Sequence, residues 1–400
     1  MREAYDAVAA GHICLDVIPD LSGSPPSKFD AMFVPGRLLN VGHVTFSTGG
    51  PVSNTGLVMH KLGISTQLMG KVGNDLFGQA VRKIVASYDP DLADGMVVDE
   101  TGSTSYTIII NWPGADRIFL HCPGANDTFC ADDVHYDRVA QARLFHFGYP
   151  PLMRLMFEDE GRQLAEIYRR AKATGVTTSL DMALPDPTST AGHANWVRIL
   201  QSTLPCVDIF FPSIEEILYM LRRETFDRLW STARWSNILP LITPELLSDL
   251  GRQLIQMGVK IVGLKLGERG LYLRTADRAA IKSPGRGCPS DPGAWAAREI
   301  WAPCFQVSVV GTTGSGDATI AGFLSALLRD MSPEDAVTAA VAVGACNVEA
   351  ADAVSGIRSW EETMQRVRSG WRRHELRLTS SDWQFDQTHQ LWIGSCQPSD

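Results

Sequence analysis

The sequence predicts an α/β protein whose central sheet is mainly parallel and carries helices on its faces. Two observations support this fold class. Short apolar segments with the length of buried strands alternate with helical stretches through the middle of the chain, at 144–148, 177–181, 207–211 and 261–266. Strands separated by helices form βαβ units with right-handed crossovers, and such units build parallel sheets. The second observation is an expected strand–turn–helix unit around the glycine-rich residues 311–316.

The composition limits the classes of protein that remain. The chain has 400 residues, of which 44 % are hydrophobic and 20 % charged, and this balance excludes a disordered, collagen-like or coiled-coil protein. Its net charge of −9 does not fit a general nucleic-acid binder. The most apolar stretch, 337–346, has about half of the roughly 20 residues that a membrane helix needs. We therefore expect neither nucleic acid nor a membrane among its partners.

The cysteines and the N-terminus indicate a cytoplasmic protein. Eight cysteines are scattered without the paired spacing of a zinc site or a disulfide framework. Reduced cysteines are usual in the cytosol. The first residues lead directly into an apolar strand pattern rather than a secretory signal. For this reason the match to a glycosylation sequon at Asn126 is interpreted as chance.

The N-terminal third of the chain is predicted to hold several strands, a helix and a hairpin. The helix begins at Pro51, has apolar residues at helical spacing, and ends at Gly63. Segments 104–112 and 117–121 are rich in β-forming residues and flank a Pro-Gly turn, which predicts a hairpin. The other extended segments of this part are 7–15, 33–46 and 67–72.

The rest of the chain contains two interruptions and a distinct C-terminus. Segment 222–249 is predicted to be a helical insertion, and 283–298, which is rich in proline and glycine, a loop. The last thirty residues contain three tryptophans without clear periodicity. We expect them to pack as an arm over the main domain, with a dimer contact as the alternative. The predicted organisation is one domain at 1–370 and a C-terminal extension at 371–400.

The most informative segment is Val309-Val310-Gly311-Thr312-Thr313-Gly314-Ser315-Gly316-Asp317-Ala318, which an amphipathic helix follows. Gly314 and Gly316 can adopt φ values that other residues avoid, so consecutive backbone N–H groups can point at one anion. The helix N-terminus adds the positive end of its dipole. A Walker A loop does not fit because Asp317 stands where that motif needs lysine, and a dinucleotide fingerprint lacks its third glycine at Thr319.

From this segment alone, two roles are open for Asp317. Beside a transferring phosphoryl group, its carboxylate would accept the proton of an attacking alcohol as a general base. An acidic residue in the first turn also stabilises the helix dipole without any catalytic role, and such residues are common.

Two ordered signatures of the sequence resemble those of the ribokinase-like (PfkB) carbohydrate kinases. Residues 311–318 with Ala321-Gly322-Phe323-Leu324 are similar to the C-terminal signature of that family. The segments similar to its N-terminal signature are Gly49-Gly50-Pro51-Val52-Ser53-Asn54, Leu62-Gly63 and 70–78. Further blocks that match are 11–16, 124–126 and 265–270. The resemblance runs from about residue 7 to about residue 358.

This resemblance implies a ribokinase-like three-layer αβα sandwich with a small β-lid at about 16–46 and 101–122. Asp317 would be the catalytic base. The anion hole for the γ-phosphate would be formed by Gly314, Ser315 and Gly316. The residues expected on the sugar are Asp16, Gly49, Gly50 and Asn54, although Asn54 also suits a helix cap. The residues expected on the nucleotide are Lys265, Gly267, Gly270, Thr313 and Asn347.

The resemblance also implies ATP and Mg²⁺. The sequence departs from the family pattern at three positions. The family's Asn-x-x-Glu magnesium motif corresponds to 213–216, where Ser213 replaces Asn and Glu216 would reach the metal through water. Gly311 replaces an acid associated with a monovalent-cation site, which speaks against activation by potassium. Asp181 is present, but Ala183 replaces the Asn of an Asp-x-Asn segment.

Together these features predict an ATP-dependent kinase that phosphorylates a hydroxymethyl group of a sugar or sugar acid. A nucleoside kinase of the same fold stays open as an alternative, because specificity resides in lid and pocket residues. A non-catalytic module that senses a sugar or nucleotide is the other alternative. The departures at Gly311 and Ser213 fit such a module. Asp317 and the two glycines of the predicted anion-binding turn at 314–316 (the cradle) argue for catalysis. A homodimer through the β-lid is a candidate assembly.

Overall fold

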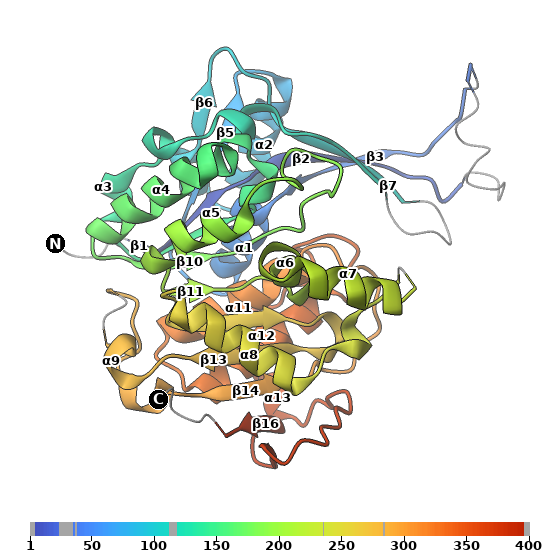
Figure 1. The fold of residues 1–400 in the computed structure, drawn as a ribbon. Coiled ribbons are helices and arrows are strands. Elements are labelled where there is room, and N and C mark those ends of the chain that lie inside the picture. Colours follow the sequence, from blue (N-terminus) through green and yellow to red (C-terminus); the bar gives the residue numbers. More distant parts are fainter. Residues whose placement is uncertain are drawn as a thin grey trace.

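A ten-stranded sheet runs through the protein (Figure 1). The computed structural model describes residues 5–23, 35–36, 38–111, 118–234, 236–282 and 285–395, and these carry the sheet in the order β15-β16-β14-β13-β12-β11-β10-β9-β1-β4. Neighbouring strands are parallel from β4 to β12 and antiparallel from β12 to β15. The strands are β1 (Tyr5–Gly11), β4 (Thr66–Met69), β9 (Ala142–Gly148), β10 (Thr177–Leu180), β11 (Ile209–Phe210), β12 (Ile261–Lys265), β13 (Leu271–Thr275), β14 (Glu299–Ala302), β15 (Trp383–Asp386) and β16 (Leu391–Gly394).

Helices cover both faces of this sheet, so the predicted αβα layering is confirmed. One core contains residues of α1 (Pro51–Lys61), α11 (Ser315–Leu328) and α12 (Pro333–Asn347), and the other those of α4 (Arg162–Ala173) and α8 (Pro244–Gln256). Successive side chains of β1 alternate between the cores, as the pleat of a strand requires: Ala7 and Ala9 join the first, Val8 and Ala10 the second. The other helices are α2 (Leu76–Ala86), α3 (Tyr136–Val139), α5 (Trp196–Thr203), α6 (Ile214–Leu221), α7 (Arg223–Thr232), α9 (Arg278–Ile281), α10 (Pro292–Trp295) and α13 (Trp360–Arg368).

A second sheet extends away from the body of the molecule (Figure 1). Its strands, in spatial order, are β3 (Val44–Gly49), β2 (Cys14–Pro19), β7 (Tyr106–Ile110) and β8 (Ile118–Cys122). Strands β7 and β8 pair antiparallel as the predicted hairpin, whose turn at 112–117 lies outside the described residues. The segment 24–34, which includes the start of the extended region expected at 33–46, also lies outside them.

The link between the two sheets is short and is held by Asn126. Strand β1 ends at Gly11 and β2 begins at Cys14, so the strand expected over 7–15 is divided between two sheets. The amide of the fully buried Asn126 side chain accepts a hydrogen bond from the Ile13 backbone (3.2 Å) and donates one to its carbonyl (2.9 Å). This residue therefore has a structural role, in agreement with interpreting its sequon as chance.

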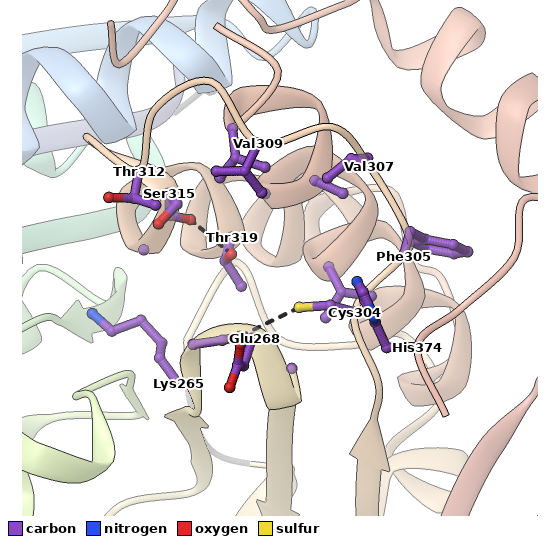
Figure 2. A pocket seen from close by; sticks show the side chains of 17 residues that line it. Lys265, Glu268, Cys304, Phe305, Val307, Val309, Thr312, Ser315, Thr319 and His374 are labelled. Atoms are coloured by element: carbon purple, nitrogen blue, oxygen red, sulfur yellow. Dashed lines mark hydrogen bonds between the residues drawn. The ribbon is translucent and has the colours of Figure 1, made fainter. Parts of the chain in front are cut away.

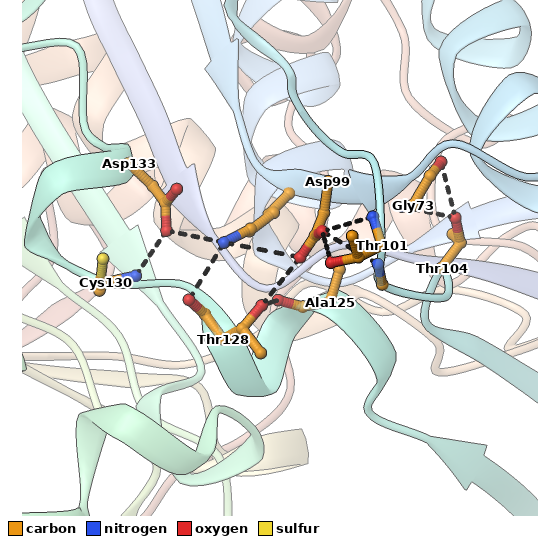
Figure 3. Close-up of polar contacts among 10 residues, drawn as sticks. Gly73, Asp99, Thr101, Thr104, Ala125, Thr128, Cys130 and Asp133 are labelled. Carbon is orange, nitrogen blue, oxygen red and sulfur yellow. Dashed lines mark hydrogen bonds and ion pairs between the residues drawn. The ribbon is translucent and has the colours of Figure 1, made fainter.

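Polar contacts of Asp99, Thr128 and Asp133 fix the base of the second sheet (Figure 3). Lys71 belongs to β5 (Lys71–Gly73), which pairs with β6 (Val97–Asp99). Its amine donates to the carbonyl of Thr128 and to Oδ2 of Asp133, both at 3.2 Å. The carboxylate of Asp99 lies 3.9 Å from the same amine and accepts hydrogen bonds from the backbone of Thr101 (3.0 Å). These contacts hold the turn that precedes β7 against the segment that follows β8.

Asp75 gives the signature block at 70–78 a structural function. Its carboxylate caps α2 by accepting a hydrogen bond from the Gly78 backbone (2.8 Å). It also accepts from the backbone N–H and the hydroxyl of Thr104, at 2.8 and 2.7 Å. One carboxylate thus joins a helix N-terminus to the start of the second sheet.

Three segments differ from their sequence prediction. The residues before the glycine-rich turn form no strand: Val309 and Val310 are 63 % and 64 % exposed, and the Val310 N–H bonds instead to the carbonyl of Val348 (2.8 Å). In the segment 222–249, α7 is a largely exposed helix, but the residues from Pro244 begin α8, which packs into the core. The expected loop at 283–298 contains the one-turn helix α10.

The C-terminal residues are part of the main sheet rather than an arm laid over it. Strands β15 and β16 form an antiparallel hairpin, and β16 pairs with β14. Buried Trp383 and Leu391 supply the apolar contacts that hold this hairpin on the sheet. The placement of a domain boundary near residue 370 stays a prediction. No helix in the described parts of the chain is long and apolar enough to span a membrane.

Candidate active site

Asp317 lies at the N-terminus of α11 and is 1 % exposed. The helix begins after Gly314, whose φ of +71° is a conformation that favours glycine, and the carbonyl of Gly314 accepts the backbone hydrogen bond of Ala318 (2.8 Å). A Cβ at Gly314 would lie 2.6 Å from that of Ala353, so this position also lacks room for a side chain. The turn thus presents backbone N–H groups and a buried carboxylate within one helical turn.

Three side chains donate hydrogen bonds to the Asp317 carboxylate. Asn54 Nδ2 and the hydroxyl of Tyr149 both lie 2.9 Å from Oδ2, and the hydroxyl of Thr55 lies 3.3 Å from Oδ1. Burial raises the pKa of Asp317, and these donors, with the nearby Lys265 ammonium, oppose that rise. The predicted residues Asn54 and Asp317 are therefore in direct contact although 263 positions separate them.

The predicted sugar residues gather where the second sheet meets α1. Asp16 is 8 % exposed on β2, and burial raises the pKa of its carboxyl to about 6 against hydrogen bonds from Cys14 and Thr107. A Cβ at Gly49 would lie 2.6 Å from Oδ2 of Asp16. One at Gly50, where φ is +89°, would lie 2.5 Å from the carbonyl oxygen of His12. Both positions of the Gly-Gly pair therefore exclude a side chain.

His12 adds an imidazole that the sequence analysis did not identify. It is 2 % exposed, and within the described residues neither ring nitrogen has a hydrogen-bond partner. Burial, together with the neighbouring His121, lowers the pKa of His12 to about 3, so the ring is neutral at physiological pH. Its centroid lies 5.2 Å from that of His121 and 6.3 Å from that of Tyr149. Burying a polar ring without hydrogen-bond partners costs free energy unless a ligand or a water molecule forms those hydrogen bonds.

A cavity of about 290 Å³ lies on the other side of the turn (Figure 2). The predicted residues that line it are Lys265, Gly267, Gly270, Ser315 and Gly316. Two other predicted nucleotide residues do not line it. Asn347 is fully buried and donates to the carbonyl of Ala353 (2.7 Å), and Thr313 is replaced along the wall by its neighbour Thr312.

Lys265 places a positive charge at the cradle. Its amine bonds to Oδ1 of the fully buried Asp181 at 2.5 Å, and a Cβ at Gly316 would lie 3.6 Å from the same amine. Burial lowers the pKa of the Lys265 amine. The carboxylates of Asp181, Glu216 and Asp317 raise this pKa by a larger amount, so the amine stays protonated. The other oxygen of Asp181 is buried without a partner in the described residues.

Comparison with known proteins identifies the family. The sequence profile of the pfkB family carbohydrate kinases matches residues 6–360. The chain belongs to the pfkB family of carbohydrate kinases. It is 25 % identical over 278 residues to an uncharacterized sugar kinase of Archaeoglobus fulgidus (69 % of this chain, 88 % of that protein) and 23 % identical over 335 residues to fructokinase-2 of Oryza sativa subsp. japonica (82 % and 81 %).

Solved structures agree on the fold. Arabidopsis thaliana ribokinase complexed with ribose and ATP is similar with a TM-score of 0.63 and 19 % identity, over 90 % of this chain and 98 % of that chain. The fold of this pfkB family member is therefore ribokinase-like, as the sequence resemblance implied. Kinases of this family use ATP with Mg²⁺.

The resemblance to the pfkB family predicts a magnesium motif at 213–216, with Ser213 in place of its asparagine. Ser213 caps α6, and the Glu216 carboxylate accepts a hydrogen bond from the Ser213 backbone (2.6 Å), so the two residues form a capping box. In the described residues no cluster of three or more His, Cys, Asp or Glu side chains could hold a metal by itself. A Mg²⁺ that keeps waters and phosphate ligands needs few carboxylates, and the unpartnered Asp181 oxygen beside Glu216 fits such an ion.

Gly311 is another position at which the sequence departs from the pattern that the family resemblance predicts. A Cβ at this position would lie 2.9 Å from the carbonyl oxygens of both Ala350 and Ala351. The carbonyls next to the turn are therefore present, while the side chain that would bring a negative charge to them is absent.

Sequence reasoning missed several side chains of this site, above all Tyr149. It follows β9 in a left-handed conformation (φ 62°), which turns its phenol toward Asp317. Its position directly after a strand, at the edge of the sheet where ligands of α/β proteins bind, was the signal available for it. Nothing in the local pattern indicated His12, which precedes the expected strand end at Asp16 by four residues.

Proposed function

We propose that this protein is an ATP-dependent kinase that phosphorylates a hydroxymethyl group of a sugar or sugar acid. The observation that carries the proposal is the position of Asp317. Its buried carboxylate accepts a hydrogen bond from Asn54, which belongs to the polar cluster where the second sheet meets α1, and the two residues before it, Ser315 and Gly316, line the cavity. A base in that position can take a proton from a hydroxyl held in the cluster.

The residues around Asp317 would have different roles in such a phosphoryl transfer. Asp16, Asn54 and His12 offer acceptors and donors of the kind that a polyol needs, and they would orient its hydroxymethyl group toward the carboxylate. The backbone of 314–316 and the Lys265 ammonium would stabilise negative charge that develops at the phosphoryl oxygens. Mg²⁺, held near Glu216 and Asp181, would neutralise phosphate charge when bound.

The second sheet would act as a lid over the sugar. It carries Asp16 and Thr107, so its movement would carry polar contacts onto or away from the substrate. Closure would exclude water, which otherwise competes with the sugar hydroxyl as acceptor. A homodimer through this lid is supported by exposed apolar side chains on its two edge strands, Phe46 (51 % exposed) on β3 and Leu120 (50 %) on β8.

The test is a coupled ATP-consumption assay on the purified protein with Mg²⁺. The acceptor panel contains ketoses, aldoses, sugar acids and nucleosides, and the Asp317→Asn variant is the matched control. Turnover of one sugar class, lost in the variant, would support the proposal and name the substrate. Turnover of nucleosides alone would establish the nucleoside-kinase alternative. Ligand binding without turnover on any acceptor would support a sensing module instead.

A further inference from the structure

The segment after residue 370 reaches the nucleotide cavity, although it lies beyond the region that matches the family. Residues 371–374 run antiparallel to 304–306: the His374 N–H bonds to the Cys304 carbonyl, and the Gln306 N–H to the Arg372 carbonyl, both at 2.8 Å. Trp371 stacks on Phe305 with ring centroids 4.5 Å apart and donates to the Gln306 carbonyl (2.9 Å). The backbone of His374 is thus fixed against a strip that itself lines the cavity.

The imidazole of His374 lines the end of the cavity away from the cradle (Figure 2). In Figure 2, Lys265, Thr312 and Ser315 lie on one side of the cavity, and Phe305, Val307 and His374 on the other. The wall at that end is mostly apolar. The Cys304 thiol beside it already donates to the Gly267 carbonyl (3.3 Å). Within the described residues, no hydrogen bond or ion pair engages the His374 ring.

A nucleobase needs apolar contact for its faces and a polar partner for its edge. Phe305, Val307 and Val341 supply the apolar surface at this end. The two ring nitrogens of an imidazole can form hydrogen bonds, and the ring can also stack on a base. With the phosphates at the cradle, the base would extend toward this end of the cavity.

We propose that His374 contacts the nucleobase of the bound nucleoside triphosphate, so that the C-terminal segment sets nucleotide affinity and base selection. This inference rests on the proposed function, because it assigns the cavity to a nucleotide. It gives the segment a role in the site in addition to its two strands in the sheet.

Calorimetric titration of the full-length protein with Mg-ATP and with Mg-GTP tests the inference without relying on turnover. The variant is His374→Ala, which keeps the backbone hydrogen bond to Cys304. The matched control is His389→Ala, because His389 belongs to the same segment but pairs with Asp386 in the hairpin turn and does not line the cavity. Thermal melting of both variants checks that the hairpin stays folded.

We expect His374→Ala to raise the dissociation constant for ATP about five- to tenfold, the value of one lost polar or stacking contact. The preference for one nucleotide, given by the ratio of the ATP and GTP dissociation constants, should become smaller. The His389→Ala variant should have the same dissociation constants as the wild type. Unchanged ATP affinity and unchanged base selection in a folded His374→Ala protein would overturn this inference and leave the proposed function intact. Absence of any nucleotide binding by the wild type would overturn both.

Discussion

The phenol of Tyr149 donates a hydrogen bond to Oδ2 of Asp317 at 2.9 Å, and Asn54 donates to the same oxygen at the same distance. Two donors on one carboxylate oxygen favour the ionised form of a group that burial would otherwise neutralise. They also fix the orientation of the carboxylate relative to the N-terminus of α11. A general base at the end of a buried helix needs both properties, because it must be unprotonated and aimed when the substrate arrives.

Replacing Tyr149 by Phe should move the acid limb of the pH–rate profile to higher pH. The hydrogen bond from Tyr149 lowers the pKa of Asp317, so its loss raises that pKa and leaves less of the base ionised at a given acidic pH. The measurement is kcat/KM against pH for the wild type and the variant. Tyr168→Phe is the control, since its hydroxyl bonds to the Ser179 carbonyl and not to Asp317. Identical acid limbs for Tyr149→Phe and wild type would show that the phenol does not tune the base.

The Asp317→Asn variant should lose activity without losing stability. Removing a general base costs roughly 10²- to 10⁴-fold in kcat, while ATP and sugar affinities should stay close to those of the wild type. Burial raises the pKa of Asp317 above its ordinary value of 3.8, so the ionised group opposes folding, and this penalty grows as pH rises from the unfolded to the folded pKa. At neutral pH the variant should therefore melt no lower than the wild type. A kcat within a few fold of wild type would refute the assigned role.

The effects of substituting Lys265 and Asp181 on the free energy of unfolding should be strongly non-additive. Lys265 is 13 % and Asp181 0 % exposed, and burial raises the pKa of Asp181 to about 8 although Lys265 lowers it. Lys265→Met therefore leaves a buried carboxyl group without its partner and should cost about 3–5 kcal/mol in the free energy of unfolding. Adding Asp181→Asn to that variant should restore much of the stability but not the nucleotide affinity. Urea unfolding of the wild type, both single variants and the double variant measures the coupling. Additive losses would mean that the pair contributes little beyond its separate members.

Activity should not depend on potassium. Gly311 leaves the carbonyls of Ala350 and Ala351 without a carboxylate beside them, so the charge that would hold a monovalent cation is missing. Rates measured in potassium, sodium and tetramethylammonium chloride at equal ionic strength should agree within about twofold, since screening alone changes little at fixed ionic strength. A severalfold stimulation specific to potassium would contradict this expectation.

The lid should carry the dimer contact. A Phe46→Asp substitution on the edge strand β3 should convert the protein from dimer to monomer, because it places a charge in an apolar interface. Size-exclusion chromatography with light scattering gives the mass of each variant. Phe385→Asp is the control, since Phe385 is similarly exposed (43 %) but lies on β15 at the opposite end of the main sheet from β4. A wild-type protein that elutes as a monomer at micromolar concentration would rule out this assembly.

Interactions between residues close together in the chain account for most of the helix boundaries and layers that the sequence predicted correctly. Helix α1 begins at Pro51 and gives way to Gly63 (φ +83°), and the turn at Gly314 opens α11, because proline and glycine restrict or release the backbone within a few residues. Alternating strands and helices gave the αβα layers for the same reason, since hydrophobic periodicity is a short-range signal. The family signatures allowed Gly49, Gly50 and Asp16 to be assigned to one site, although they are distant in the sequence.

Only the tertiary structure decided which distant side chains meet. Tyr149 reaches Asp317 across 168 positions, and His374 lines the same cavity as Lys265. Strand order and the geometry of crossovers set these contacts, and no local pattern encodes them. The same applies to the strand expected before the glycine-rich turn. The N–H of Val310 instead bonds to the carbonyl of Val348, the residue that follows α12, because this contact outweighed local β-propensity. The sequence thus indicates which residues belong to the site, while the contacts between them depend on how the sheet is assembled.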